Sequence, residues 1–252
     1  MNEYTAEEKD WLRGVKARKG RPKLPYEVQL VAFIDILGIK AQVIKSGEEA
    51  SKIVDMMESI RKNIETLCHE YTETKQIRLL QIGDGFYFVA DKSCVNEMCN
   101  ILAEIQWQVL VQWRELIRGS LTAGRVRVGK DNNFFIGQAI VEAFELEREN
   151  AIFPRIICEE SKIEEYVGKG IIDNIAYINT DQDKIKYINY IRYKVDNDGL
   201  TEKKLKELII DQGVGDALKK EYEALLGENK SAAQKYGWLF SQLEPYKVQI
   251  IT

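Results

Sequence analysis

Two apolar, strand-like runs each carry one aspartate, and these runs constrain the fold of this chain more than any other feature. The first is Val31-Ala-Phe-Ile-Asp-Ile-Leu-Gly38, in which Asp35 interrupts an apolar strand just before a glycine. The second is Leu79-Leu-Gln-Ile-Gly-Asp-Gly-Phe-Tyr-Phe-Val89, where Asp84 lies between two glycines, as the tip of a tight hairpin requires. A carboxylate in an apolar strand is costly to bury unless a cation neutralises it. We therefore expect Asp35 and Asp84 to converge on a site for two divalent metal ions.

Composition excludes several other classes of protein. The chain has 252 residues, of which 45% are hydrophobic and 30% charged, so it can bury a substantial core. Its formal net charge of −4 gives no reason to expect a nucleic-acid or membrane partner. No apolar run approaches the roughly 20 residues that span a bilayer, and the N-terminus has no signal-peptide core. The four cysteines lack CxxC spacing and His69 is the single histidine, so a zinc site, a disulfide framework and a histidine-dependent triad are disfavoured. A cytoplasmic location fits best.

Hydrophobic periodicity predicts alternating strands and helices up to residue 160. The predicted order is strand 28–37, helix 47–70, hairpin 76–90, helix 95–115, strand 116–128, helix 138–149 and strand 154–158. This order predicts an α+β, ferredoxin-like (split βαβ) fold, with a mainly antiparallel sheet and helices on one face.

The remaining segments predict a lead-in and an extension around this core. Residues 1–26 form a polar, basic lead-in, residues 27–195 the main domain, and residues 196–252 a C-terminal helical extension packed on the core. Strand-like pieces lie at 171–178 and 186–194. Helices are expected at 201–210, 214–226 and 231–243, the last capped by Ser231 and ending before Pro245.

Four fragments, in this order, resemble the catalytic domain of class III nucleotide cyclases over residues 30–160. Phe33-Ile-Asp-Ile-Leu-Gly-Ile39 looks like the first metal motif with its phosphate-cradling turn, and Gly83-Asp84 like the second metal motif. Arg118-Gly-Ser-Leu-Thr-Ala-Gly124 is similar to the family's long strand, and the helix Gly137–Glu147 follows the family's spacing. The resemblance implies a class III cyclase core that makes 3′,5′-cyclic mononucleotides from nucleoside triphosphates.

The chain departs from that pattern where the family reads a purine and stabilises charge. Leu80 and Phe134 stand at two positions where purine cyclases carry hydrogen-bonding readers of the base, and apolar groups there would leave an adenine's polar edge unpaired. Val141 and Glu145 replace the family's asparagine and transition-state arginine. Arg125, Arg127 and Arg155 are candidates to replace that arginine.

Three runs resemble the bacterial pyrimidine cyclases of the Pycsar anti-phage systems: the helix from Gly137, Ala151-Ile-Phe-Pro-Arg-Ile-Ile157, and Lys235-Tyr-Gly-Trp-Leu239. This resemblance implies a homodimer, with sites at the interface, that converts UTP or CTP to cUMP or cCMP plus pyrophosphate. A separately encoded effector would read this signal, and the sequence does not choose between uracil and cytosine.

The same resemblance implies the site residues. Two divalent cations, Mn²⁺ or Mg²⁺, would be held by Asp35, Asp84 and the Ile36 carbonyl, with Arg118 as a further catalytic group. Backbone N–H groups around Leu37 to Lys40 are placed to cradle phosphate. The implied substrate-binding residues are Phe33, Leu37, Gly38, Ile39, Lys40, Leu80 and Phe134.

Structural interpretations remain open beside these functional ones. Asp35 could cap the turn at Gly38, Asp84 could be an ordinary hairpin residue, and Arg118 could be an exposed strand residue. Glu142, Glu145, Glu147 and Glu149 predict a solvated or arginine-paired helix face rather than a third metal site. As a function, the alternative is a cyclase-like domain that senses a nucleotide without turnover. A palm-type polymerase or diguanylate cyclase is disfavoured, because the Gly-Gly-Asp-Glu-Phe signature and a basic nucleic-acid track are missing.

Overall fold

A computed structural model describes residues 26–47, 51–70, 77–129 and 133–250. All but Tyr26 of the predicted lead-in lies outside these residues. The central strand is β1 (Glu27–Ile36), which pairs with β3 (Gly85–Asp91) on one side and β4 (Ile117–Val128) on the other. Its side chains alternate between the two faces of the sheet, so Leu30, Ala32 and Ile34 enter one core and Val31 and Phe33 enter another.

The predicted ferredoxin-like core is confirmed by the strand order. β2 (Arg78–Ile82), β3, β1 and β4 are neighbours in that order, and all three pairs are antiparallel. In the described ranges the sheet has eight strands. β6 (Ile156–Cys158) joins β4 in parallel, and β8 (Lys186–Ile188) and β7 (Ile178–Thr180) follow antiparallel, while β5 (Phe135–Gly137) pairs with the end of β4.

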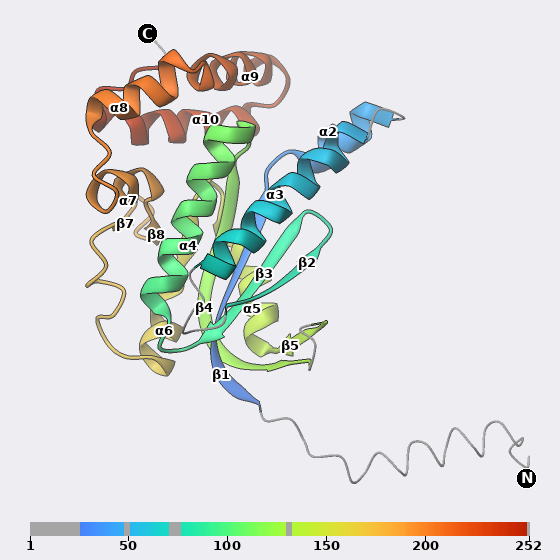
Figure 1. Ribbon diagram of the computed structural model, residues 1–252, viewed down its shortest axis with the longest axis vertical. Coiled ribbons are helices and arrows are strands. Elements are labelled where there is room, and N and C mark those ends of the chain that lie inside the picture. The colour runs from blue at the N-terminus through green and yellow to red at the C-terminus, as the bar shows by residue number, and fades with distance from the viewer. Residues whose placement is uncertain (1–25, 48–50, 71–76, 130–132, 251–252) are drawn as a thin grey trace, which may run out of the picture.

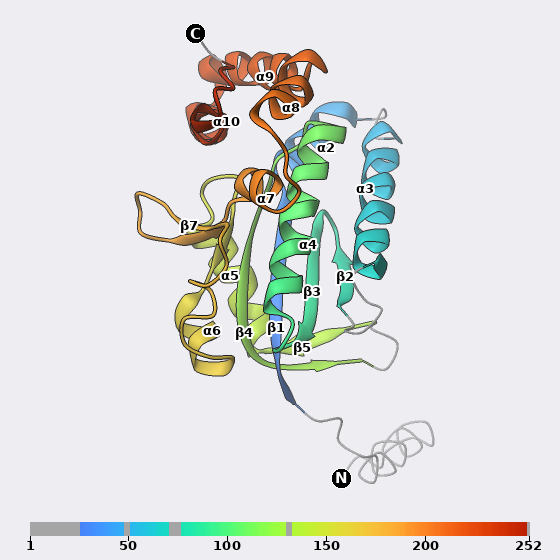
Figure 2. The same cartoon turned by 60° about the vertical axis from the view of Figure 1, so that its left-hand side comes forward.

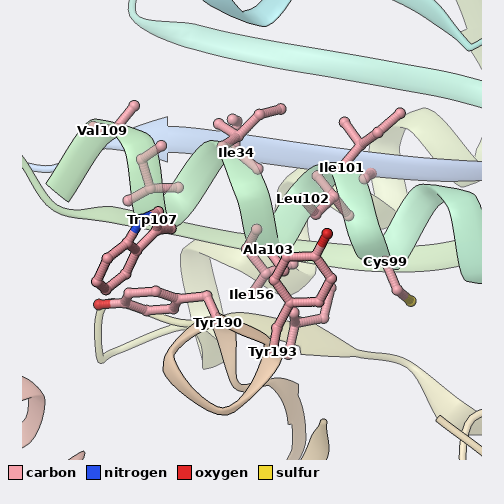
Figure 3. Packing of buried hydrophobic residues seen from close by; sticks show 14 of the residues in the cluster. Ile34, Cys99, Ile101, Leu102, Ala103, Trp107, Val109, Ile156, Tyr190 and Tyr193 are labelled. Carbon is pink, nitrogen blue, oxygen red and sulfur yellow. The ribbon is translucent and has the colours of Figure 1, made fainter. Parts of the chain in front are cut away.

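Helices cover both faces of the sheet rather than one. α3 (Ser51–Glu70) and α4 (Val95–Gln108) lie on one face, as expected, and α5 (Gln138–Asn150) packs on β4 and β1 from the other side (Figure 2). The larger core lies under α4. Figure 3 shows Tyr190 beside Trp107 in this core, where α7 (Tyr190–Asp196) meets α4.

Periodicity missed short elements and mistook one helix for a strand. The missed elements are α2 (Ile39–Ser46), β5 and α6 (Glu160–Tyr166). The helix predicted over 95–115 is present as α4 and the π-helical turn η3 (Val109–Trp113) that ends it. Residues 171–177 form turns, so the strand predicted there is wrong except at Ile178. The strand predicted at 186–194 ends at Ile188, where Asn189 caps α7 by accepting a hydrogen bond from the Arg192 backbone N–H.

The C-terminal helices form as the sequence predicts. They are α8 (Glu202–Lys206), the π-helical turn η4 (Glu207–Asp211), α9 (Val214–Glu228), α10 (Lys230–Leu243) and the short 3₁₀ helix η5 (Glu244–Tyr246). Asn229, and not Ser231, caps α10 by accepting a hydrogen bond from the Ala232 backbone N–H. These helices gather at the end of the sheet where β1 ends and α2 begins (Figure 1). The division at residue 195 stays a prediction.

Candidate active site

Asp35 and Asp84 lie at the same end of the sheet, on neighbouring strands. Asp35 is next to last in β1, and its partner in β3 is Gly85, the residue after Asp84. Neighbouring strands are about 5 Å apart, so the two aspartates are adjacent. Burial raises the pKa of the Asp35 carboxyl, and the negative charge of Asp84 raises it further. The structure therefore brings the two predicted metal ligands together.

Glycines on both sides of Asp84 make this approach possible. Gly83 has a φ of +65°, in the left-handed region that side chains rarely adopt. A Cβ atom on Gly85 would lie 2.6 Å from Cε2 of Phe33, because the Phe33 ring lies directly over this residue. The Gly-Asp-Gly sequence thus lets the hairpin turn tightly and lie against β1.

Arg118 pairs with Asp35 from the opposite strand. Asp35 and Arg118 are partners in the β1–β4 ladder, and Nη2 and Nε of Arg118 lie 3.3 and 3.4 Å from Asp35 Oδ2. Nε also lies 2.5 Å from Glu147 Oε1, but this contact lacks hydrogen-bond geometry because the N–H is directed at Asp35. One guanidinium thus serves two carboxylates at the rim of the sheet.

Glu147 reaches this rim because α5 packs very closely on the sheet. Ala139, Ala143 and Glu147 lie four residues apart and face β4. The Ser120 hydroxyl donates to the Ala143 carbonyl at 2.6 Å, and the Glu147 side chain is only 3% exposed. Burial raises the pKa of Glu147 to about 7, against the opposing positive charge of Arg118.

Sequence reasoning placed Glu147 on a solvated or arginine-paired face and missed its place in the site. The arginine pairing is present, but the side chain is buried. The four-residue spacing from the two alanines was the signal that could have found it. Glu145, which stands at the family's arginine position, is exposed together with Val141 on the outer side of α5.

The turn between β1 and α2 has free backbone donors, with one correction to the expected set. Gly38 has a φ of +90° and precedes α2, so the N–H groups of Ile39, Lys40 and Ala41 have no partner within the helix. The Leu37 N–H donates to the Leu116 carbonyl at 2.8 Å and is therefore unavailable to a phosphate. The phosphate contact predicted through the Leu37 N–H is thus excluded, and the rest of the predicted role of Leu37 stays a prediction.

The predicted base-reading positions lie apart from each other. Leu80 packs against the cluster of Phe33 and Tyr87, on the Asp35 face of the sheet. Phe134 is 45% exposed beyond the far end of β4, roughly 30 Å from Arg118 at 3.3 Å per residue along the strand. Phe134 and the aspartates of one chain therefore cannot contact one small ligand. Phe33 is buried, with its ring centroid 4.6 Å from that of Tyr87.

None of the three arginines that were candidates for the missing transition-state arginine lies beside Asp35 and Asp84 of its own chain. Arg155 is fully buried and pairs with Asp181 and Asp183, so its role is structural. Arg125 and Arg127 lie near the other end of β4, with side chains on the face opposite Arg118. Lys235 of α10 is a cation that lies near the site instead, and it interacts electrostatically with Asp35, Glu147 and Arg118. The sequence had singled out Lys235 only as part of the run from Lys235 to Leu239.

The residues present fit divalent cations. Carboxylate oxygens are the ligands that Mg²⁺ and Mn²⁺ prefer. The pKa of Asp35 is raised first by burial and then by the charge of Asp84, and a bound cation would offset both effects. Within the described ranges no group of three or more acidic, histidine or cysteine side chains is arranged to hold a metal. Two aspartates, with the Ile36 carbonyl, are therefore the donor set to be tested.

No protein-family model and no curated protein matches this chain. Solved structures with a similar arrangement include a bacterial light-regulated adenylyl cyclase, at 14% identity and a TM-score of 0.46 over 75% of this chain and 67% of that one. Adenylate cyclases from Trypanosoma brucei match at 11% sequence identity and a TM-score of 0.48, over 68% of this chain and 93% of theirs. A class III adenylyl cyclase-like ATP-binding protein from Pseudomonas aeruginosa matches at 15% sequence identity and a TM-score of 0.49, over 73% of this chain and 47% of that one. Likenesses of this size transfer no activity to this chain. In the described part of the chain, no helix combines the length and apolarity of a membrane span.

Proposed function

We propose that the chain is a nucleotide cyclase that converts a pyrimidine nucleoside triphosphate, UTP or CTP, to its 3′,5′-cyclic monophosphate and pyrophosphate. The observation that carries this proposal is the pair Asp35 and Asp84, adjacent at one end of the sheet beside Arg118 and the free N–H groups of α2. Paired carboxylates next to anion-binding donors suit a ligand that carries phosphates and divalent cations.

In the proposed reaction the ribose 3′-oxygen bonds to the α-phosphorus. The bond from that phosphorus to the oxygen bridging to the β-phosphate breaks, pyrophosphate leaves, and the hydroxyl proton is lost to solvent. Two divalent cations, when bound, would lower the pKa of the hydroxyl and neutralise charge on the phosphates. Asp35, Asp84 and the Ile36 carbonyl would hold them.

The protein's own groups orient the triphosphate. Backbone N–H groups of Ile39 and Lys40 donate to phosphate oxygens, and the Lys40 ammonium, which is exposed, lies at the same turn. Arg118 is held by Asp35 and Glu147 and directs its remaining N–H groups to the phosphates. Without a neighbouring histidine, activation of the hydroxyl by the cations is simpler than activation by a general base.

Pyrimidine selectivity and a homodimer belong to the same proposal. Leu80 and Phe134 offer no hydrogen bonds to a purine edge, which disfavours adenine and guanine. Because Phe134 lies far from the aspartates of its own chain, it would contact the base only from a second copy, so we place the sites at a dimer interface. Exposed apolar side chains are available for such contact: Val43, Ile44, Ile82, Phe134, Ile136, Val141 and Phe144. An anti-phage signal read by a separate effector, in the cytoplasm, follows from the Pycsar resemblance alone.

The test is a product assay. Purified protein with Mn²⁺ is incubated separately with ATP, GTP, CTP and UTP, and products are identified by mass spectrometry. We expect a cyclic monophosphate from UTP or CTP and none from Asp84→Ala, with Asp55→Ala, an exposed α3 variant, as the matched control. If folded protein yields no cyclic product from any of the four, the proposed activity is wrong. Tight binding with the triphosphate recovered intact would instead indicate a sensor.

A further inference from the structure

A cation from the C-terminal helices lies beside the acidic site. α10 is placed near the end of the sheet where β1 ends and α2 begins (Figures 1 and 2). Its anchor is Trp238, whose ring stacks on Phe153 at 5.8 Å and whose Nε1–H donates to Asp181 Oδ2 at 2.8 Å. The position of α10 is thus fixed by specific contacts with the core.

The position of Trp238 on α10 also determines where Lys235 lies. Lys235 precedes Trp238 by three residues, so both lie on the same side of α10. Trp238 packs in the same small cluster as Leu146, the neighbour of Glu147 on α5. In agreement with this placement, the charge of Lys235 acts on Asp35 and on Glu147.

No described anion contacts the Lys235 ammonium directly. It is partly buried, and among the described residues it forms neither a hydrogen bond nor an ion pair within 4.0 Å. Burial lowers the pKa of its ammonium, and the nearby Arg118 lowers it further. A partly desolvated ammonium without a contacting anion is costly, and an arriving anion would relieve that cost.

The two arginines near this end of the sheet already have carboxylate partners, whereas the exposed Lys40 at the start of α2 is a further cation of the site. Arg118 contacts both Asp35 and Glu147, and Arg155 is enclosed by its own two aspartates. We propose that Lys235 binds the polyphosphate of the substrate at the Asp35–Asp84 site, so that the C-terminal helix supplies a cation that the outer side of α5 lacks. This assignment rests on the proposed function, since it requires a phosphate-bearing ligand there. A lysine ammonium is a compact charge that suits a phosphate oxygen.

A purely structural role makes a different prediction. If Lys235 only balances the charge of Asp35 and Glu147, its removal strengthens divalent-cation binding, because a repulsive charge is lost. Polyphosphate binding then weakens only by the screened effect of a charge that does not touch it, well below the roughly tenfold loss of a direct contact. If Lys235 contacts phosphate, its removal weakens polyphosphate binding by that larger factor. The two roles are therefore separated by the ligand titrated and by the size of the loss.

The experiment is calorimetric titration of the purified full chain with the Mg²⁺ complex of inorganic tripolyphosphate, and separately with Mn²⁺ alone. Tripolyphosphate carries no base, so the result is independent of pyrimidine selectivity. We expect Lys235→Gln to weaken tripolyphosphate binding about tenfold, the value of one charge-assisted contact, and Lys235→Arg to retain most of the affinity. Lys230→Gln, an exposed lysine on the same helix, is the matched control and should bind as wild type.

Each remaining outcome decides a different point. Wild-type affinity or only a small, screened loss in Lys235→Gln, with or without a gain in Mn²⁺ affinity, overturns the assignment of Lys235 while leaving the metal site intact. Loss of binding in Asp84→Asn shows that the probe occupies that site. If the wild-type chain itself does not bind tripolyphosphate, the proposed function fails, and the role of Lys235 fails with it. Thermal unfolding of every variant verifies that it is folded.

Discussion

Arg118 and Arg155 each join two carboxylates, yet their surroundings are opposite. Arg155 is fully buried, and although burial alone would raise the pKa of its partner Asp183, hydrogen bonds from Arg155 and the Ile185 N–H bring that pKa below its ordinary value. Arg118 is 25% exposed, and both of its partners, Asp35 and Glu147, have raised pKa values. Each cluster sets one arginine against two carboxylates, but the Arg118 cluster also has Asp84, whose charge raises the pKa of Asp35 beyond the effect of burial. The Arg118 cluster therefore holds the larger excess of negative charge. Such an excess is what a cation-binding site requires.

The sharpest form of this comparison removes one carboxylate from each cluster. Asp35→Asn should lower turnover at least about a thousandfold, because a cation loses one of its two carboxylates, and should leave the unfolding temperature near that of wild type. Asp183→Asn should leave turnover within a few-fold of wild type and lower the unfolding temperature. Steady-state cyclase assays and thermal denaturation measure the two effects. Equal losses of turnover in both variants would remove the distinction between the clusters.

Removing the arginines tests the same contrast through stability. Arg155→Met should lower the free energy of unfolding by about 3 kcal/mol, because it breaks a buried charge pair. Arg118→Met, at the solvent-accessible rim, should cost less than about 1 kcal/mol. Urea denaturation followed by circular dichroism measures both values. A larger loss for Arg118→Met would mean that the rim cluster holds the fold together.

The smallest effect concerns the pH dependence of stability. The pKa of Glu147 is about 7 in the folded chain, against an ordinary value of 4.5. The folded state therefore holds this proton more tightly, and stability from Glu147 is present below about pH 4.5 and is lost as pH rises through about 7. Glu147→Gln should reduce the loss of unfolding free energy between these pH values by about 2 kcal/mol. Glu149→Gln, an exposed control, should leave that loss unchanged. Urea denaturation across this pH range measures the slopes, and identical slopes in wild type and Glu147→Gln would contradict the burial of a titrating carboxyl.

The elements that sequence reasoning found are those with a strong periodic signal. β1, the Asp84 hairpin, α4 and α10 each have a long apolar pattern, so their positions could be predicted, although the cap of α10 was assigned to Ser231 instead of Asn229. Strand order followed from the order of elements. Short elements such as α2 and β5 were missed, because eight or three residues carry too little periodicity.

A residue of the candidate site could be predicted only where its own type and its immediate neighbours in the sequence are unusual. Asp35 and Asp84 stand out within apolar strands. Glu147 and Lys235 do not, because their importance arises from packing: α5 approaches β4 through alanines, and α10 is fixed by Trp238 far along the chain. Arg155 was misjudged for the same reason, since Asp181 and Asp183 follow it by more than twenty residues and meet it only in the folded chain.

The Phe33 ring over Gly85 has a consequence for how related chains can differ. A Cβ atom at position 85 would come within 2.6 Å of that ring, so the two positions cannot be enlarged independently. Among homologues we expect them to covary, with a larger residue at 85 only where 33 has become small, and this coupling would bind the hairpin and the central strand to change together.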